Sequence, residues 1–159
     1  MTNRCIIVGA SHAAAQLAPA LRQAGWEGEI LIVGDEPYLP YHRPPLSKTF
    51  LSGAKSVEEL FIRPAAFYEK NAIEFRTGRV TAINRVEKIL ELKSGETLSY
   101  DKLALCTGSR VREISIPGIE LEGVHYLRHI QDVEGMKRAV VEGKQALIIG
   151  GGYIGLETA

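Results

Sequence analysis

One local pattern occurs twice in this chain: a short apolar run, a glycine-containing turn and the start of a helix. The first copy is "RCIIVGASHAA", with its apolar run at residues 4–8, and the second is "QALIIGGGYIGLETA", which begins at Gln145. Continuous apolar runs rich in branched residues are typical of strands buried on both faces of a parallel sheet. The sequence therefore predicts an α/β protein built from strand-turn-helix units.

The first copy continues into a complete β-α-β unit. Its helix stops at Gly25, and "EILIV" at 29–33 has the pattern of a second buried strand. The segments 46–53 and 63–71 resemble short helical pieces. The next three segments, "EFRTGRVTAINR", "KILELKSGETLSY" and "DKLALCTG", alternate or run apolar between turn residues. They predict a small antiparallel meander that leads into a last buried strand at 102–106.

The second copy follows a proline-glycine turn and a helix predicted from about 130 to 142. We expect residues 1–115 to belong to one nucleotide-binding domain and residues 116–159 to begin a second one. Because the last predicted helix has only just started at Ala159, we also expect the chain to be part of a longer protein.

Composition excludes several kinds of partner. Nineteen basic and nineteen acidic residues give a formal net charge of zero, which argues against a nucleic-acid or anionic-membrane surface. The apolar run "ALIIG" is far too short to span a bilayer, and the chain enters its first strand without a signal-peptide pattern, so we expect a reducing cytoplasm. Cys5 and Cys106 fit small core residues, and the four scattered histidines predict no metal site.

The second turn, "GGGYIG", matches the G-x-G-x-x-G pattern of dinucleotide-binding turns. In that pattern the first glycine makes a tight turn, the second lets a pyrophosphate approach the backbone, and the third lets the helix pack on the strand. The matching glycines and the two residues enclosed by them are Gly150, Gly152, Tyr153, Ile154 and Gly155. The alternative is a glycine-rich turn that binds no ligand. The acidic residue that would distinguish NAD from NADP lies outside residues 1–159.

The first turn departs from the pattern, because Ser11 stands at the second glycine position and Ala14 at the third. Alanine is tolerated at the third position, whereas the Cβ of a serine intrudes where the phosphates must come close. Asp35, followed by Glu36, comes directly after the second strand, where a carboxylate can accept hydrogen bonds from both ribose hydroxyls of an adenosine. The alternative is an aspartate that only caps the loop.

The segment "YLPYHRPPLSK" places three prolines before Lys48. Together with "YDKLALCTGSR", "HYLRHIQD" and "IIGGGYIGLE", it resembles the NADH-dependent ferredoxin, putidaredoxin and rubredoxin reductases, within the larger glutathione-reductase-like fold. The resemblance covers the whole chain. It implies a Rossmann-like FAD-binding domain followed by the start of a Rossmann-like NAD-binding domain.

The resemblance also implies roles for individual residues. The FAD pyrophosphate would be held by Gly9, Ser11, Ala13 and Ala14, and the adenosine ribose by Asp35, with Glu36 as a further cofactor-binding residue. Val80 would contact the adenine, and Thr107 and Gly108 would close over the cofactor. Arg43, Lys48 and Arg128 would lie along the flavin, and Glu157 would extend toward Lys48. A rigid proline path could deliver the lysine amine to the ring, where a cation stabilises the reduced flavin. The alternative is that Lys48 only caps a short surface helix.

The activity implied by the resemblance is hydride transfer from NAD(P)H to FAD, followed by single-electron transfers to a ferredoxin or rubredoxin that serves an oxygenase. A disulfide-reductase mechanism is disfavoured, because no cysteine pair follows "RPPLSK". One alternative is a scaffold or sensor of the apoptosis-inducing-factor kind, which binds FAD and NADH but acts by changing partners. Another is a nucleotide-binding module without chemistry. We expect residues 1–159 alone to be inactive and to retain little or no FAD.

Overall fold

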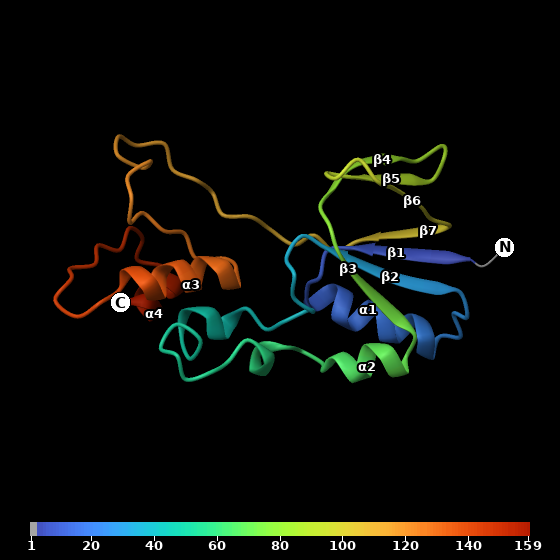
Figure 1. The fold of residues 1–159 in the computed structure, drawn as a ribbon, viewed down its shortest axis with the longest axis horizontal. Helices are drawn as coiled ribbons and strands as arrows, with labels where there is room; N and C mark the ends of the chain where they lie inside the picture. Colours follow the sequence, from blue (N-terminus) through green and yellow to red (C-terminus); the bar gives the residue numbers. More distant parts are fainter. Residues whose placement is uncertain (1–2) are drawn as a thin grey trace. The chain divides into compact units, whose positions relative to one another are not determined.

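The computed structural model describes residues 3–159, which form two compact units (Figure 1). The first unit combines the chain up to Tyr41 with Phe61–Gly108, and the second combines His42–Leu60 with Ser109–Ala159. His42–Leu60, the part of the loop region that includes Lys48, therefore groups with the later part of the chain. The predicted division into nucleotide-binding domains at residues 115 and 116 stays a prediction.

A four-stranded parallel sheet forms the centre of the first unit. Its strands lie in the order β3-β2-β1-β7, with β1 at Arg4–Val8, β2 at Glu29–Gly34, β3 at Ile73–Thr77 and β7 at Lys102–Leu105. The helices α1 (His12–Gln23) and α2 (Ala65–Lys70) lie on one side of this sheet, and the antiparallel strands β4 (Val80–Asn84), β5 (Ile89–Leu92) and β6 (Thr97–Ser99) lie on the other (Figure 1). This arrangement confirms the predicted fold class.

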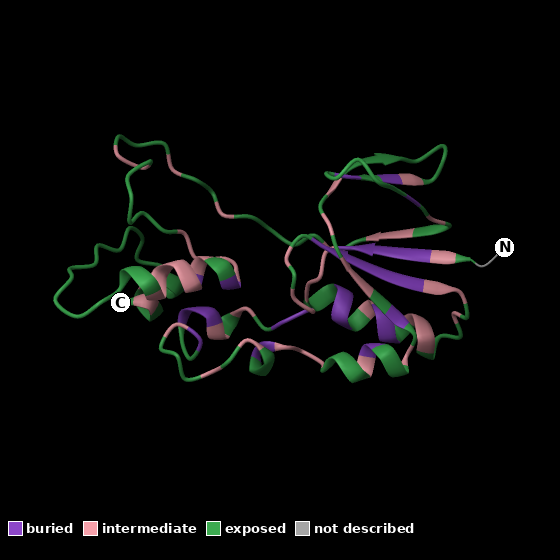
Figure 2. Cartoon of the chain, viewed as in Figure 1, coloured by how far each residue is buried: buried purple, intermediate pink, exposed green. Residues whose placement is uncertain are grey.

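Burial on both faces explains the continuous apolar runs of β1 and β2. Successive side chains of a strand point to opposite faces, so Ile7 and Ile32 pack with α1, whereas Ile6 and Val33 pack with Leu90 and its neighbours in the meander. These strands are accordingly buried along nearly their whole length (Figure 2). Among the described residues, no helix has both the length and the apolar character needed to cross a membrane.

The strand β3 was expected in the antiparallel meander, and this expectation was wrong. Residues 73–77 pair in parallel with β2, with Ile73 opposite Ile30 and Phe75 opposite Ile32. A parallel pair needs a long crossover connection, and the loop and α2 between β2 and β3 provide it. Alternation along a strand does not specify the direction of its partner, so the sequence pattern could not distinguish the two sheets.

Arg22 ties the end of α1 to the starts of two strands. Its guanidinium donates to the carbonyl oxygens of Trp26 and Gly28 at 2.7 Å, before β2. It also donates to those of Asn71 at 2.8 Å and Ala72 at 2.7 Å, before β3. One side chain thereby satisfies four carbonyls in turns that would otherwise lack donors.

Short helices and a small apolar core make up the second unit. The helical elements are η1 (Pro44–Ser47), η2 (Glu58–Leu60), α3 (Ile130–Ala139) and α4 (Tyr153–Thr158). Leu46, Phe50 and Leu60 from the loop are buried, as are Ile130 and Val133 of α3. The ammonium of Lys137 lies 3.9 Å from the ring centroid of Phe50, which adds a cation–π contact between α3 and the loop. The helix predicted to end near residue 142 ends at Ala139.

The second buried strand, predicted before the turn at Gly150, is absent from the described structure. Residues 144–150 have no regular secondary structure, and Leu147 and Ile149 are 88% and 69% exposed (Figure 2). A strand of a parallel sheet needs a hydrogen-bonded neighbour, and residues 109–159 contain no strand that could pair with it. The prediction of a buried strand before Gly150 is therefore wrong for the described residues.

Candidate functional site: two turns and a lysine–glutamate pair

The carboxyl ends of β1, β2 and β7 meet at one edge of the parallel sheet. Val8 lies opposite both Val33 and Leu105, so the residues that follow these three strands emerge side by side. At this edge the chain leaves β1 toward β2 on one side, while β7 lies on the other. Such a reversal of strand order forms the crevice in which open α/β sheets bind nucleotides.

Gly9 is required by the close approach of two strand ends at this edge. Its φ is +104°, and a Cβ at this position would lie 2.3 Å from the carbonyl oxygen of Cys106 and 2.8 Å from the amide nitrogen of Thr107. The amide of Gly9 donates to the carbonyl of Val33 at 2.7 Å. The turn is therefore fixed to both neighbouring strands and has no room for a side chain.

The first turn of α1, which follows Gly9 in the chain, contains the backbone amides of Ala13 and Ala14. Ser11 is the N-cap, its hydroxyl makes no capping bond, and the first turn of the helix contains no acidic residue. The first amides of a helix have no partner within the helix and carry a partial positive charge, so those of Ala13 and Ala14 can receive an anion. Ser11 itself has φ −108° and ψ 179°, an extended conformation that serine adopts without strain.

Asp35 and Glu36 differ in the hydrogen bonds that their carboxylates accept from the protein. The carboxylate of Glu36 accepts a hydrogen bond from the hydroxyl of Tyr41 at 2.7 Å. Asp35 is exposed and accepts no hydrogen bond from the part of the chain that the structure describes. It directly follows Gly34, where a Cβ would lie 2.7 Å from that of Ala10 in the glycine turn. Asp35 is therefore the carboxylate at this edge that remains available to a ligand.

Three further predicted cofactor residues also belong to the first unit. Thr107 and Gly108 are exposed and follow β7 at the same edge. Val80 begins β4, lies opposite Leu92 and packs against the core on the meander side of the sheet. Their contacts with FAD stay predictions.

Arg43 and Arg128 come together in the second unit. Arg43 donates through Nη1 to the carbonyl oxygen of Arg128 at 2.6 Å and lies 3.3 Å from Nδ1 of His129. The backbone amides of Arg128 and His129 donate to the carboxylate of Asp132, which caps α3. The guanidinium of Arg128 donates to the carbonyl of Ser109 at 3.1 Å. The amino end of the loop is thus anchored to α3, and the predicted contacts of both arginines with the flavin stay predictions.

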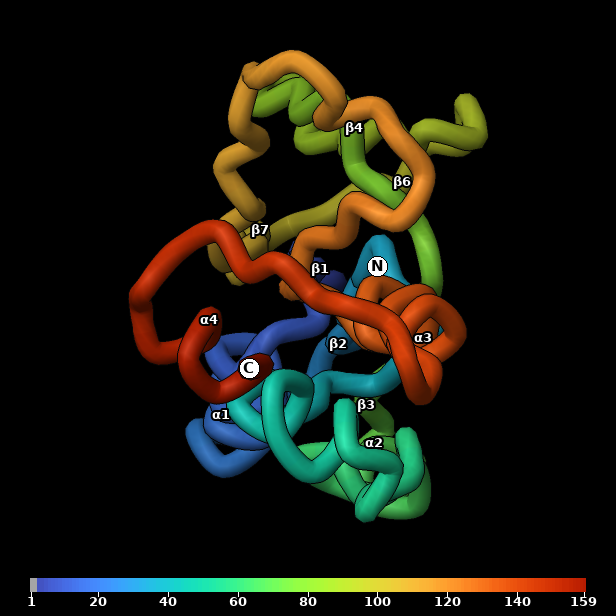
Figure 3. The backbone as a smooth tube through the Cα atoms, turned by 90° about the vertical axis from the view of Figure 1, so that its left-hand side faces the viewer, coloured from blue at the N-terminus to red at the C-terminus, as the bar shows by residue number. Residues whose placement is uncertain are grey.

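Lys48 lies at the carboxyl end of η1 and faces α4. Its backbone amide donates to the carbonyl of Pro45, so the residue does end a short helix. Its ammonium lies 3.0 Å from Oε1 of Glu157, and Figures 1 and 3 show α4 beside the loop. The structure therefore brings together the two residues predicted to be catalytic, which lie far apart in the sequence.

Ser47 is a site residue that sequence reasoning missed. Its buried hydroxyl donates to Oε2 of Glu157 at 2.6 Å, so both carboxylate oxygens are engaged by consecutive residues of one turn. The pKa of Glu157 is lowered, first by the hydrogen bond from Ser47 and then by the hydrogen bond from Lys48. The only sequence signal was that this serine directly precedes Lys48.

The second glycine turn has the same backbone conformation as the first at its first and third positions. Gly150 has φ +121°, and Gly152 is the N-cap of α4 with an extended backbone like that of Ser11. A Cβ at Gly155 would lie 2.1 Å from the carbonyl oxygen of Gly150, whereas one at Gly152 would meet nothing within 4 Å. Tyr153 and Ile154 are exposed. The predicted contacts of these residues with a pyridine nucleotide stay predictions.

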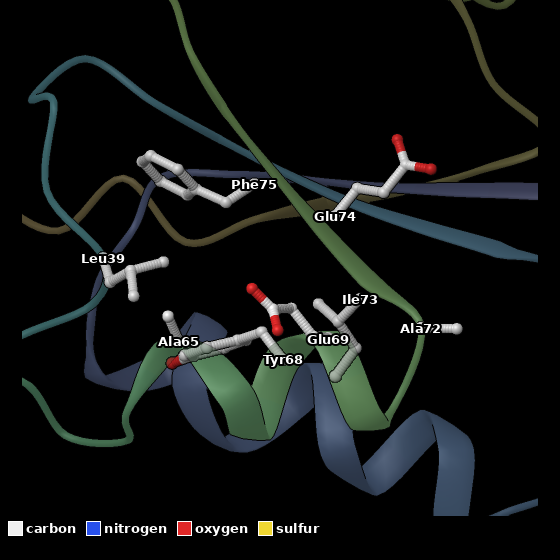
Figure 4. A pocket seen from close by; sticks show the side chains of 8 residues that line it. All are labelled: Leu39, Ala65, Tyr68, Glu69, Ala72, Ile73, Glu74 and Phe75. Carbon is white, nitrogen blue, oxygen red and sulfur yellow. The ribbon is translucent and has the colours of Figure 1, made fainter.

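An open pocket of about 460 Å³ lies elsewhere in the first unit and contains none of the predicted site residues (Figure 4). It lies between α2 and β3 and is lined by Leu39, Ala65, Tyr68, Glu69, Ala72, Ile73, Glu74 and Phe75. Two glutamates in this lining would repel a diphosphate. The hydroxyl of Tyr68 has no hydrogen-bond partner among the described residues, but it is itself buried, and this burial raises its pKa. This pocket is therefore a poorer candidate for a nucleotide site than the strand ends.

Comparison with known proteins agrees with these features. The chain is 46% identical over 158 residues to the probable ferredoxin reductase CtmF of Castellaniella defragrans, covering 99% of this chain and 39% of that protein. It is 40% identical to the putidaredoxin reductase CamA of Pseudomonas putida, covering 99% of this chain and 38% of that protein. The ferredoxin reductase for the CYP199A2 system from Rhodopseudomonas palustris superimposes with a TM-score of 0.91 at 39% identity, over 98% of this chain and 39% of that one.

The chain thus spans about 39% of the length of these relatives. The family model described as pyridine nucleotide-disulphide oxidoreductase matches residues 3–159. This match extends through both glycine turns and the loop that carries Lys48. The chain therefore belongs to the pyridine nucleotide-disulphide oxidoreductase family.

Proposed function

We propose that the complete protein is a flavoprotein reductase that passes electrons from NAD(P)H through FAD to a small iron–sulfur protein, a ferredoxin or rubredoxin, which serves an oxygenase. The observation that carries the proposal is the likeness of the whole chain to proteins named as ferredoxin and putidaredoxin reductases. Bound FAD would accept a hydride from the nicotinamide and release electrons singly. We propose that this reaction takes place in the cytoplasm.

The strand ends of the first unit fit the diphosphate and ribose of FAD. Gly9 leaves the backbone open, and the first amides of α1 have neither a side-chain cap nor an acidic neighbour in the first turn. Both features favour an anion, and the available carboxylate of Asp35 suits a pair of ribose hydroxyls. In this proposal Ser11, Ala13 and Ala14 border the diphosphate, while Glu36 supports the edge through Tyr41.

The loop of the second unit would supply the charge next to the flavin ring. In this proposal Lys48 holds its ammonium beside the isoalloxazine, and Glu157 fixes and partly balances that charge. Arg43 and Arg128 would border the same cofactor from the turn that precedes α3. The second glycine turn would hold the pyridine nucleotide.

Disulfide chemistry is not part of the proposal, although the family name includes it. Cys5 and Cys106 are free, and burial raises the pKa of both thiols. A raised pKa reduces the fraction of thiolate, which is the nucleophile in disulfide exchange. Neither residue belongs to a pair of neighbouring cysteines in the sequence.

An absorption spectrum of the full-length protein, before and after anaerobic NADH, tests the proposal. We expect a bound flavin that NADH bleaches and that ferredoxin or rubredoxin then reoxidises over many turnovers. NADPH in place of NADH determines which nucleotide is used. A long-lived charge-transfer complex with feeble turnover would favour a scaffold of the apoptosis-inducing-factor kind. A purified full-length protein without flavin would leave only a nucleotide-binding module.

A further inference from the structure

The carboxylate of Glu157 is held at both oxygens by two consecutive residues of the proline-rich turn. Ser47 Oγ lies 2.6 Å from Oε2, and Lys48 Nζ lies 3.0 Å from Oε1. The hydroxyl of Ser47 has one proton, and its other acceptor, the carbonyl oxygen of Pro44, is 3.5 Å away. Since that distance is too long for a strong hydrogen bond, the proton of Ser47 belongs to Glu157.

Ser47 and Lys48 differ in how firmly they are held. Ser47 is 4% exposed and follows two prolines and the buried Leu46, so its hydroxyl has little freedom. The side chain of Lys48 is 52% exposed, and that of Glu157 is 30% exposed. An exposed pair between two long side chains is weak and mobile when nothing else holds it. The rigid member of this group is therefore the serine.

We propose that Ser47 is a positioning residue, whose hydroxyl fixes the Glu157 carboxylate so that Oε1 holds the Lys48 ammonium in one place. The inference rests on the proposed function, in which that ammonium lies beside the flavin. Without the hydroxyl, the carboxylate can turn about its last torsion, and Lys48 loses its fixed partner. Ser47 would then affect the rate of flavin reduction without contacting the flavin or the diphosphate.

The lowered pKa of Glu157 reports directly on the hydrogen bond from Ser47, and the rate–pH profile is the readout that a merely structural serine would not move. Among the described residues, Lys48 is the charged group that faces Glu157, and η1 is the element packed against α4 on that side. The hydrogen bond from Ser47 is the largest cause of the lowered pKa. Its removal should raise the pKa of Glu157 toward the ordinary value of a carboxyl group.

The experiment compares four variants of the full-length holoprotein. S47A removes the hydroxyl, S47C keeps a similar volume with only a weak donor, and S47T keeps the hydroxyl. S52A is the matched control, because the exposed Ser52 donates only to the carbonyl of Thr49, at 3.2 Å, in the same loop. The first measurement is the pKa of the Glu157 carboxyl by ¹³C NMR of labelled glutamate, assigned with E157Q. The second is the rate of flavin reduction by NADH across pH.

We expect S47A and S47C to raise the pKa of Glu157 and to slow flavin reduction by roughly three- to tenfold, about the effect of losing one hydrogen bond. The acid limb of their rate–pH profile should move to higher pH, while S47T and S52A behave like the parent. An unchanged pKa in both S47A and S47C would overturn the proposal. So would a raised pKa with an unchanged rate–pH profile, because Ser47 would then be structural only.

The NMR measurement also separates this inference from the proposed function. If the full-length protein binds no flavin, the proposed reductase activity fails, and so does the part of the inference that concerns flavin reduction. The pKa of Glu157 in S47A and S47C still decides whether Ser47 fixes the carboxylate. If flavin and turnover are normal but the pKa does not move, only the inference about Ser47 fails.

Discussion

A methyl group on Gly9 would lie 2.3 Å from the carbonyl oxygen of Cys106. The turn after β1 and the end of β7 thus approach each other more closely than any side chain allows. The amide of Cys106 donates to the carbonyl of Val8 at 2.7 Å, so neither segment can move away without breaking the sheet. The edge that we propose for the diphosphate is therefore rigid before any ligand arrives.

Replacement of Gly9 by alanine should destabilise the fold strongly. A positive φ costs a non-glycine residue about 1–2 kcal/mol, and overpacking adds typically about 1–3 kcal/mol. We expect a total loss of about 3 kcal/mol or more, measured from the midpoint of urea unfolding. Gly25→Ala is the matched control, because Gly25 has φ +84° with nothing within 4 Å of a Cβ. Equal losses in the two variants would show that the contact with Cys106 is unimportant.

Replacement by alanine should disturb the fold of the second turn at Gly155 but not at Gly152. In Gly155→Ala the new methyl would meet the carbonyl of Gly150 at 2.1 Å, so we expect the turn to be displaced and NADH binding by the full-length protein to weaken at least tenfold. In Gly152→Ala the methyl meets no protein atom within 4 Å, so the free protein should keep its stability. Thermal unfolding measures the stability of each variant, and titration with NADH measures its affinity for the nucleotide. A stable Gly155→Ala protein with unchanged affinity would contradict this account.

Arg22→Lys should cost stability although it keeps the charge. The guanidinium donates to four carbonyl oxygens from one fixed fork, a geometry that an ammonium cannot reproduce. We expect a loss of about 2–4 kcal/mol in the free energy of unfolding, because several carbonyls lose a charged donor. Arg79→Lys, at an exposed position, is the control and should change stability by less than about 0.5 kcal/mol.

The contact between α4 and the loop should weaken in acid. The folded state lowers the pKa of Glu157, so this contact contributes stability above the ordinary carboxyl pKa of about 4.3 and loses it as the pH falls through the lowered value. The backbone amide shifts of Ser47 and Lys48 should follow this titration. In E157Q the amide side chain does not titrate, so the shifts should stay flat. In E142Q, which removes an exposed carboxylate, they should titrate as in the parent.

The fold of the first unit was largely predictable, because β1, α1 and β2 carry strong local patterns. The strand segment Ile30–Val33 is apolar at every position, so both of its faces must be covered. A parallel sheet with a packed layer on each side covers both faces. The direction of β3 was not predictable, since alternation is the same for parallel and antiparallel partners. The strand expected before Gly150 required a neighbour that residues 109–159 do not contain.

The residues of the candidate site that were predicted from the sequence are those whose side-chain type is needed for the proposed chemistry. Lys48 and Glu157 were identified as partners through the resemblance, and the structure places them in contact. Ser47 was missed, because a serine in a loop is common and its role depends on a helix that lies far along the chain. The joint anchoring of Arg43 and Arg128 was missed for the same reason.

The extended backbone at Ser11 has a practical consequence for recognising such proteins. This turn demands a glycine at its first position, where φ is positive, but it accepts an ordinary residue two positions later. A search pattern that insists on both glycines would find the second turn of this chain, at Gly150 and Gly152, but would miss this first turn. A pattern weighted by the sign of φ at each position would retain it, together with other turns of this shape that the familiar fingerprint overlooks.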